Sequence, residues 1–368
     1  MIRRVKFENF KALRDVEISF DERLTVLVGP NGSGKSSVLQ GIHILSLAVQ
    51  DKKPHLVFSG SYALANLIGE TRDSRLLLRA DTLTPKGWVG FRVITPVEKG
   101  AAQVPLNGKL VWVEGSWVRL NGGEVIGAGD AQSAEPFSSD LKATTLIRLL
   151  AERLAAPSQA KSARPVLEPD GGGLASVLRS MLGNQPDRFG DLVRAFRRVI
   201  PTAEGIRFDL VEIPERSEEK QIYDRVLVDF RNARGVPASA VSDGTLYILG
   251  LLAVIFGFDS PKIILCDDLD HGLHPKAQME LIRVLRELMT EVPDLQIIAT
   301  SHSLYVLSEL PENSIRVLTL GPDGGVVCGR LSDHPDYEAW KEAMTPGEFW
   351  SHVGEDWLLK RKPVAVPQ

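Results

Sequence analysis

The stretch VLVGPNGSGKSS, residues 26–37, decides the fold of this chain. Its first three residues close an apolar run, Leu24 to Val28, and this run predicts a strand buried on both faces of a parallel sheet. After a turn rich in glycine, the segment from Ser36 to Gln50 carries apolar side chains at helical spacing on one face. We therefore expect a buried strand, a glycine loop and a helix in direct succession.

The glycine loop matches the pattern G-x-x-x-x-G-K-[ST] from Gly29 to Ser36. Its glycines allow backbone N–H groups to turn toward phosphate oxygens, and the start of the following helix adds a positive partial charge. Lys35 would reach the β- and γ-phosphates of a nucleotide, and the Ser36 hydroxyl would coordinate Mg²⁺. The pattern predicts ATP and Mg²⁺ as cofactors, because a dinucleotide fingerprint lacks the Gly-Lys-Ser ending. The expected phosphate-binding residues are Asn31, Gly32, Ser33, Gly34, Lys35, Ser36 and Ser37.

Two further apolar runs end in polar residues, as strands do at the ligand-binding edge of a parallel sheet. The first, Lys262 to Asp268, ends in two carboxylates: we expect Asp267 to hold Mg²⁺ and Asp268 to orient or deprotonate the attacking water. The second, Ile297 to Ser303, includes His302, which we expect to contact the γ-phosphate or that water. The alternative for the first run is an acidic turn after a strand, and the alternative for His302 is a structural role.

A fourth segment, Val241 to Thr245, precedes a strongly apolar helix pattern. Ser242 fits the N-cap position of that helix, where its side chain would accept a backbone hydrogen bond. In the functional alternative, the Ser242 hydroxyl and the backbone of Gly244 donate to a phosphate.

These four motifs, in this order, resemble those of the ABC-type ATPases, in particular the RecF/OLD/SMC-like branch that is grouped with AAA-family ATPases. Besides the glycine loop, the specific similarities to that family are Ile2 to Phe10 followed by Lys11, Ser242 to Thr245 as the signature motif, Asp267 to Pro275, and Thr300 to Ser303 as the switch-histidine loop. The resemblance covers residues 1–70 and 200–320. It implies an α/β fold, the ABC-type P-loop NTPase head, with a mixed sheet, N-terminal antiparallel strands and an inserted lobe of strands and helices.

The resemblance also implies a head-to-tail homodimer with two ATP molecules at its interface. Ser242 and Gly244 of one subunit would face the γ-phosphate bound by the other. Asp270 would lie in the loop that communicates across the interface.

Two positions depart from the family. Asp268 stands where the family usually has glutamate, and its shorter side chain leads us to expect slow hydrolysis. The glutamine that usually contacts Mg²⁺ has no clear counterpart; Gln103 lies in a suitable region of the chain.

We expect four segments: the N-terminal half of the ATPase core (1–70), an inserted lobe (71–205), the C-terminal half of the core (206–325) and a C-terminal extension (326–368). The first half of the lobe is rich in strand patterns, and Leu141 to Ala155 fits a helix. No sustained heptads occur, so a long coiled-coil arm is excluded. The other expected helices are 174–182, 188–199, 245–256 and 275–289, and the expected strands around them are 206–213, 223–230, 262–266 and 296–299.

The composition is that of an ordinary globular protein, with a formal net charge of −4, so the chain as a whole is not a polycation. The two cysteines form no metal-ligand pair, and no signal peptide or membrane-spanning run is present, so we expect a cytoplasmic protein without a membrane partner. Four arginines between Arg188 and Arg198 favour either a solvated helix face or a contact with phosphates. The aromatics after residue 330 would pack on the core or form a partner surface.

Two functions follow from the resemblance. The first is a dimeric, slowly hydrolysing ATPase that acts as a nucleotide-driven switch on DNA or on a partner effector, a nuclease or toxin, in bacterial anti-phage defence. The second is a RecF-like ATPase that binds DNA in repair. A transporter subunit is disfavoured, because its Leu-Ser-Gly-Gly-Gln signature is absent.

Overall fold

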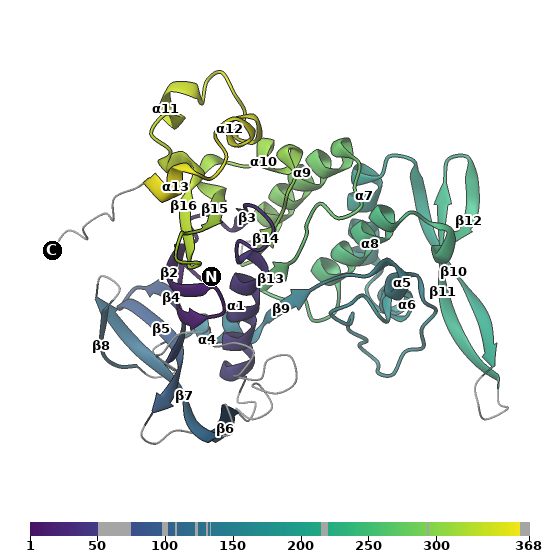
Figure 1. Ribbon diagram of the computed structural model, residues 1–368. Helices are drawn as coiled ribbons and strands as arrows, with labels where there is room; N and C mark the ends of the chain where they lie inside the picture. The colour runs from purple at the N-terminus through teal and green to yellow at the C-terminus, as the bar shows by residue number, and fades with distance from the viewer. Residues whose placement is uncertain are drawn as a thin grey trace. The chain divides into compact units, whose positions relative to one another are not determined.

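The computed structural model describes residues 1–50, 75–97, 102–106, 109–121, 124–129, 132, 134–214, 220–292 and 294–360 (Figure 1). The chain divides into two compact units. Unit 1 consists of Met1–Leu146, Lys262–Asp267 and Asp294–Gln368, and unit 2 of Ile147–Pro261 and Asp268–Pro293.

An antiparallel sheet opens unit 1. Its order is β2-β1-β4-β5-β7-β6, and β8 pairs with β7. The strands are β1 (Arg4–Phe10), β2 (Leu13–Ser19), β4 (Leu76–Thr84), β5 (Gly87–Val97), β6 (Ala102–Leu106), β7 (Lys109–Asn121) and β8 (Glu124–Ala128). In β1 Val5 and Phe7 are buried and Lys6 and Glu8 are half-buried, which is the alternation expected of a strand with one face on a core.

Strand β1 pairs with β2 on one side and with β4 on the other, Val5 lying opposite Ile18 and Ala80. The segment that we expected to begin a separate lobe at residue 71 therefore continues the N-terminal sheet, and this expected boundary is corrected. Patterns within single strands do not reveal such pairing between distant segments.

The second sheet of unit 1 carries the glycine loop. Its order is β16-β15-β3-β14-β13-β9. Its strands are β3 (Leu24–Val28), β9 (Thr144–Ile147), β13 (Ile263–Cys266), β14 (Gln296–Thr300), β15 (Ile315–Leu320) and β16 (Val326–Arg330). Strands β15, β3, β14 and β13 run parallel and β16 is antiparallel to β15, so the expected mixed sheet is confirmed.

The predicted helix from Leu141 to Ala155 is wrong. The segment instead forms the end of α4 (Phe137–Lys142), then β9, then the short α5 (Ala151–Ala155). Thr144 and Thr145 open β9, and β-branched residues of this kind favour strands. Just before β9, the Ala143 carbonyl accepts hydrogen bonds from the backbone N–H groups of Lys262 and Ile263, and β9 lies beside β13 in the sheet.

Helix α1 (Lys35–Val49) joins the two sheets of unit 1 into one core. Its buried side chains, such as Val38 and Ile42, share a hydrophobic cluster with residues of both sheets. A side chain at Gly41 would meet the Phe7 ring at 2.4 Å, so α1 and β1 approach closely there. This packing holds the start of α1 at the carboxyl edge of the parallel sheet (Figure 1).

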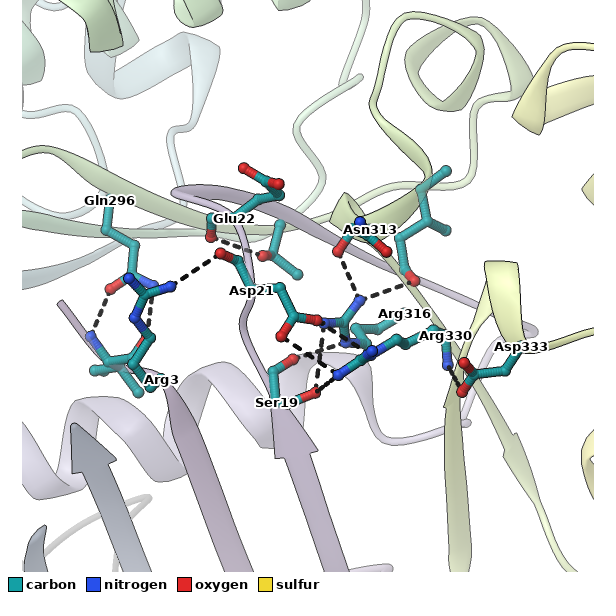
Figure 2. Close-up of polar contacts among 12 residues, drawn as sticks. Arg3, Ser19, Asp21, Glu22, Gln296, Asn313, Arg316, Arg330 and Asp333 are labelled. Carbon is teal, nitrogen blue, oxygen red and sulfur yellow. Dashed lines mark hydrogen bonds and ion pairs between the residues drawn. The ribbon is translucent and has the colours of Figure 1, made fainter. Parts of the chain in front are cut away.

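Polar side chains tie together the segments that precede the parallel strands (Figure 2). Arg316 is 2% exposed and donates to the carbonyls of Ser19 and Asn313 at 2.7 and 2.9 Å. Its guanidinium also pairs with Asp21, as does that of Arg330. Burial lowers the pKa of Arg316, and the Asp21 carboxylate opposes that shift.

Unit 2 combines helices with the three-stranded sheet β10-β11-β12. The helices expected from the sequence at residues 174–182, 188–199, 245–256 and 275–289 are confirmed, as are the strands at 206–213 and 223–230. The observed bounds are α6 (Leu174–Asn184), α7 (Pro186–Val199), α8 (Asp243–Phe256), α9 (Pro275–Glu291), β10 (Ala203–Pro214), β11 (Lys220–Phe230), β12 (Ala233–Pro237) and the 3₁₀ turn η2 (Ala238–Ala240). Helix α7 packs against α6, α8 and α9.

The C-terminal part of unit 1 is helical. It contains α10 (Leu304–Ser308), α11 (Tyr337–Trp340), α12 (Pro346–Val353), α13 (Trp357–Lys360) and the 3₁₀ turns η3 (Glu312–Ser314) and η4 (Leu331–Asp333). Phe349 and Trp357 are buried and lie edge-on to the His334 ring, so these aromatics pack on the core, whereas Trp340 is 43% exposed. Among the residues the structure describes, no helix has both the length and the apolar character needed to cross a bilayer.

Candidate functional site

The glycine loop is shaped by its glycines. Gly29 has φ +143°, and a Cβ there would lie 2.0 Å from the Leu318 carbonyl oxygen of β15, so no side chain fits. Gly32 and Gly34 have φ +81° and +91°, in the left-handed region that favours glycine. Asn31 and Gly32 are exposed, so the loop presents its backbone to solvent between β3 and α1.

The N-terminus of α1 is open to an anion. Gly34 occupies its N-cap position without a side-chain hydrogen bond, and no acidic residue lies in the first turn. The first N–H groups of such a helix have no intrahelical partner and carry a positive partial charge. The Ser33 hydroxyl is buried and has no hydrogen-bond partner within the described part of the chain. These features fit a phosphate group bound in the loop.

Lys35 folds back over the same loop. Its side chain is 7% exposed, and its Nζ donates to the carbonyl oxygens of Gly29 and Pro30 at 2.9 and 3.0 Å. These acceptors are neutral, so phosphate oxygens would be stronger partners for the ammonium group.

The first carboxylate meets the loop directly. Asp267 follows β13, and the Ser36 hydroxyl donates to its Oδ1 at 2.9 Å. The Thr300 hydroxyl, at the end of β14, donates to the same oxygen at 2.8 Å. The strands β3, β14 and β13 are parallel neighbours, which brings their three carboxyl ends to one edge of the sheet. The structure thus places together the two residues that the sequence singled out for Mg²⁺.

Among the described residues, no group of three or more histidine, cysteine or acidic side chains could hold a metal by itself. Mg²⁺ characteristically uses one or two protein ligands together with substrate phosphates and water. Ser36 and Asp267 beside the phosphate loop fit that donor set.

Asp268 has a strained backbone. Its φ is +57°, a left-handed value that few residues other than glycine adopt, although aspartate and asparagine tolerate it best. Its carbonyl accepts a hydrogen bond from the His271 N–H at 3.0 Å, which closes the turn after the carboxylates. Asp268 is the first residue of unit 2 at this junction, and its side chain is exposed. Because aspartate tolerates a left-handed backbone better than glutamate, this conformation gives a physical reason for the shorter residue at this position.

His302 lies in a loop that is held on both sides. The Ser301 N–H donates to the Leu27 carbonyl at 3.2 Å, just before the glycine loop, and the Ser301 hydroxyl accepts from the Ser303 N–H at 3.0 Å. Ser303 then caps α10 by accepting from the Tyr305 N–H at 3.1 Å. The exposed His302 is thereby presented at the same sheet edge as the phosphate loop.

The fourth motif lies in unit 2, at the start of α8. Ser242 occupies the N-cap position, but its hydroxyl bonds the Thr245 hydroxyl at 2.8 Å and makes no side-chain cap. The expectation that its side chain caps the helix is therefore corrected. Gly244 is buried, and a Cβ there would lie 2.3 Å from the carbonyl oxygen of Gly272.

The turn that packs on Gly244 belongs to the segment after the carboxylates. Gly272 has φ +66°, and Oδ1 of Asp270 is buried without a hydrogen-bond partner among the described residues. A buried, unsatisfied carboxylate oxygen is costly and calls for a partner. The family resemblance implied that Asp270 lies in a loop that communicates across an interface, which stays a prediction.

Two further expectations concerned Gln103, as the glutamine that contacts Mg²⁺, and the arginines of α7, as a solvated face or a phosphate contact. Gln103 lies in β6, the edge strand at the far end of the antiparallel sheet from β2, opposite Trp112 in β7. On α7, Arg198 pairs with Glu280 and Glu287, and these hydrogen-bonded carboxylates raise its pKa, Glu287 most strongly.

The remaining arginines of α7 are largely engaged as well. Arg194 pairs with Asp191, and Arg188 donates to the Ser260 hydroxyl at 2.6 Å. The arginine cluster on α7 is thus mostly bonded within unit 2, which favours a solvated helix face over a phosphate contact.

Sequence reasoning named Thr300 only as part of the histidine loop and missed its contact with Asp267, which required knowing that β14 and β13 are neighbours. A second unforeseen contact is the hydrogen bond that Lys11 donates to Gln40 of α1. Lys11 has φ +55° in the turn between β1 and β2, and burial lowers the pKa of its ammonium group.

Two family models match: one described as "AAA domain, putative AbiEii toxin, Type IV TA system" over residues 146–308, and one described as "AAA ATPase domain" over residues 1–75. Among curated proteins, the Septu protein PtuA of Bacillus mycoides is 23% identical over 334 residues, which cover 86% of this chain and 40% of that protein.

Shorter stretches match DNA repair proteins. The DNA double-strand break repair Rad50 ATPase of Methanopyrus kandleri is 55% identical over 42 residues, 11% of this chain and 5% of that protein. The DNA replication and repair protein RecF of Chlorobium luteolum is 44% identical over 46 residues, 12% of each chain. The aligned stretches thus span at most 40% of the length of these relatives.

Solved structures share the fold. An SMC head bound to the C-terminal winged-helix domain of ScpA aligns with a TM-score of 0.54 at 15% identity, covering 92% of this chain and 99% of that one. The SMC head domain from Thermotoga maritima aligns with a TM-score of 0.50 at 13% identity, covering 89% and 98%. The expected α/β head with a mixed sheet is confirmed.

Proposed function

We propose that this chain is an ABC-type ATPase of the RecF/SMC-like group that binds ATP with Mg²⁺ and hydrolyses it slowly. Matches to two AAA-family models and the fold shared with SMC heads support this proposal. The observation that carries the proposal is the 2.9 Å hydrogen bond between Ser36 and Asp267. It joins the two expected Mg²⁺ ligands from positions 231 residues apart, beside an uncapped helix N-terminus.

In the proposed site, backbone N–H groups from Asn31 to Ser37 hold the phosphates. Lys35 exchanges its two carbonyl acceptors for the β- and γ-phosphate oxygens. The Ser36 hydroxyl can keep donating to Asp267 while its oxygen lone pairs face the metal ion. Mg²⁺, when bound, neutralises charge that develops on the phosphates.

Hydrolysis needs a base for the attacking water, and Asp268 takes that role in the proposal. It accepts a proton as the water oxygen bonds to the γ-phosphorus and the bond to the ADP oxygen breaks. His302, at the end of β14, contacts the γ-phosphate or the water. A side chain one methylene shorter than glutamate, on a left-handed backbone, supports a slow reaction.

The site is completed by a second copy of the chain in this proposal. Helix α8 has no side-chain cap at its N-terminus, so Ser242 and Gly244 can offer donors to a γ-phosphate bound by the other subunit. The buried, unsatisfied Asp270 carboxylate oxygen supports an interface at the neighbouring turn. ATP binding would then close the dimer and hydrolysis would open it.

We further propose that this nucleotide cycle switches a partner effector, a nuclease or toxin, in anti-phage defence. The likeness that covers most of the chain is to a Septu protein, and one matching family model is described by a toxin–antitoxin system. The alternative is a RecF-like ATPase that binds DNA, supported by the short matches to repair proteins.

The Lys35→Ala variant tests nucleotide binding. We expect at least about a hundred-fold loss of ATP affinity, about 2.7 kcal/mol, measured by calorimetry. Lys86→Ala removes an exposed lysine in the turn between β4 and β5 and serves as the control. Equal ATP affinity in both variants would refute the proposed phosphate site.

The Ser242→Arg variant tests the shared site. We expect ATP binding by the monomer to persist while ATP-dependent dimerisation and turnover are lost, because a long charged side chain would block the approach of the second copy. Ser239→Arg makes the same exposed substitution in η2 and should leave the dimer intact. Sedimentation with and without ATP measures dimerisation of both variants, and phosphate release measures their turnover. Wild-type turnover by Ser242→Arg would contradict the shared-site proposal.

A titration with duplex DNA separates the two functions. ATP-dependent, salt-sensitive binding by this protein alone would favour the repair function. Binding that appears only with a partner effector would favour the switch.

A further inference from the structure

Thr300 has a hydroxyl that the fold alone does not require. It is the last residue of β14, it is completely buried, and it pairs with Leu27 of β3. A β-branched side chain suits this strand position, and valine would fill the same volume. A buried hydroxyl costs free energy unless it is hydrogen-bonded, so its partner is the informative feature.

That partner is the carboxylate of Asp267. The Thr300 hydroxyl donates to Oδ1 at 2.8 Å, and the Ser36 hydroxyl donates to the same oxygen at 2.9 Å. A carboxylate oxygen accepts about two such bonds, so Oδ1 is fully engaged by hydroxyl donors. Within the described residues no hydrogen bond to the other oxygen, Oδ2, is found, so it is available to an incoming ligand.

We infer that Thr300 is a positioning residue that orients the Asp267 carboxylate toward Mg²⁺. This inference rests on the proposed function, because it concerns the same nucleotide site. The hydrogen bond to a charged acceptor is of the stronger kind, and it fixes the carboxylate plane before metal and nucleotide arrive.

The same contact links the metal carboxylate to the histidine loop. Thr300 lies two residues before His302, and the intervening Ser301 is bonded through its N–H to the Leu27 carbonyl. The end of β14 is therefore tied at once to β3, which leads into the phosphate loop, and to Asp267 after β13. A displacement of the Asp267 carboxylate would be passed to the strand end that carries His302.

The test is the Thr300→Val variant of the full chain, compared with wild type by binding of a fluorescent ATP analogue over a range of Mg²⁺ concentrations. We expect the Mg²⁺ concentration at half-maximal effect to rise about tenfold, equivalent to about 1.4 kcal/mol. Nucleotide affinity in EDTA should be unchanged. Thr300→Ser keeps the donor and should restore the wild-type Mg²⁺ dependence.

A matched control lies at the opposite end of the neighbouring strand. Thr25 in β3 is also completely buried, pairs with Ile298 of β14, and donates to the Glu22 carbonyl at 3.3 Å. Thr25→Val should lower the melting temperature and leave the Mg²⁺ dependence of nucleotide binding unchanged, because the loss is purely structural.

The outcomes separate the two proposals. A wild-type protein whose nucleotide binding ignores Mg²⁺ would overturn the proposed function. A wild-type protein that responds to Mg²⁺, with Thr300→Val responding identically, would overturn the role of Thr300 alone. If Thr300→Val does not fold, Thr300→Ala removes the same donor without adding an apolar group and carries the same expectation.

Discussion

The amino and carboxyl edges of the parallel sheet in unit 1 satisfy their polar side chains in different ways. At the amino edge the partners are mainly backbone groups of other segments. The Gln296 amide, completely buried at the start of β14, accepts from the Ile2 N–H at 2.8 Å and donates to the Ile2 carbonyl at 2.9 Å. Arg316 likewise bonds the carbonyls of Ser19 and Asn313 (Figure 2).

At the carboxyl edge the partners belong to the loops of the site itself. Lys35 bonds two carbonyls of its own loop, and the hydroxyls of Ser36 and Thr300 converge on Asp267. In the proposed site, Lys35 exchanges its two bonds for phosphate oxygens, whereas the bonds of Ser36 and Thr300 are kept and orient Asp267. The bonds at the amino edge have no part in the proposed site. If the proposed function is right, one edge serves stability and the other binding, so substitutions at the two edges should have separable effects.

The largest effect is expected at Asp268. Asn tolerates the left-handed backbone at φ +57° but cannot take a proton, so Asp268→Asn should keep the fold and ATP binding. Turnover should fall about a thousand-fold, about 4 kcal/mol in the activation barrier. Phosphate release measures turnover, and sedimentation with ATP should show a persistent dimer. Wild-type turnover by this variant would exclude Asp268 as the base.

Asp268→Glu is the informative companion. The longer side chain should bring the carboxylate nearer the water and speed hydrolysis, while the left-handed backbone should cost about 1 kcal/mol of stability. A glutamate variant that is no faster than wild type would mean that the short side chain does not explain slow turnover.

The next largest effect is expected at the amino edge, for Arg316→Met. The substitution removes a buried guanidinium that bonds partly buried carbonyls and Asp21, and we expect the free energy of unfolding to fall by about 3 kcal/mol. Nucleotide affinity should stay at the wild-type value. Denaturant unfolding with and without ATP and Mg²⁺ measures both quantities.

Arg330→Met is the control for that prediction. Arg330 pairs with the same Asp21, but its side chain is 39% exposed, so its loss should cost less than about 1 kcal/mol. Equal losses in the two variants would show that the charge pair with Asp21, and not the bonds of Arg316 to backbone carbonyls, supports this edge.

The sequence predicted the elements that carry a local pattern. The glycine loop, the buried β3 and the strand ends at Asp267 and His302 all follow from motifs a few residues long, and they lie where expected. Pairing between distant segments was not predictable, because the register of β4 against β1 depends on side chains some 75 residues apart in sequence. The same limit explains β9, where pairing beside β13 overrides a helix-like pattern.

Within the site, residue identity was predictable and conformation was not. The motifs named Lys35, Ser36 and Asp267, but the left-handed backbone of Asp268 and the contact of Thr300 with Asp267 exist only in the folded chain. Ser242 shows the opposite error: it stands at an N-cap position with a capping residue type, yet its hydroxyl bonds Thr245.

A smaller effect than that of Arg316→Met is expected for Gln296→Leu. Leucine fills a similar volume but leaves the Ile2 N–H and carbonyl without their partners in a fully buried position, so the free energy of unfolding should fall by about 2 kcal/mol. Gln50→Leu is the control, because that amide donates to the Lys142 carbonyl at 2.9 Å from a partly exposed position and its loss should cost under about 1 kcal/mol. Gln296 opens the same strand that Thr300 ends. If Gln296→Leu shifted the Mg²⁺ dependence of nucleotide binding as far as Thr300→Val does, β14 would act as one rigid lever and the division of labour between the two edges would fail.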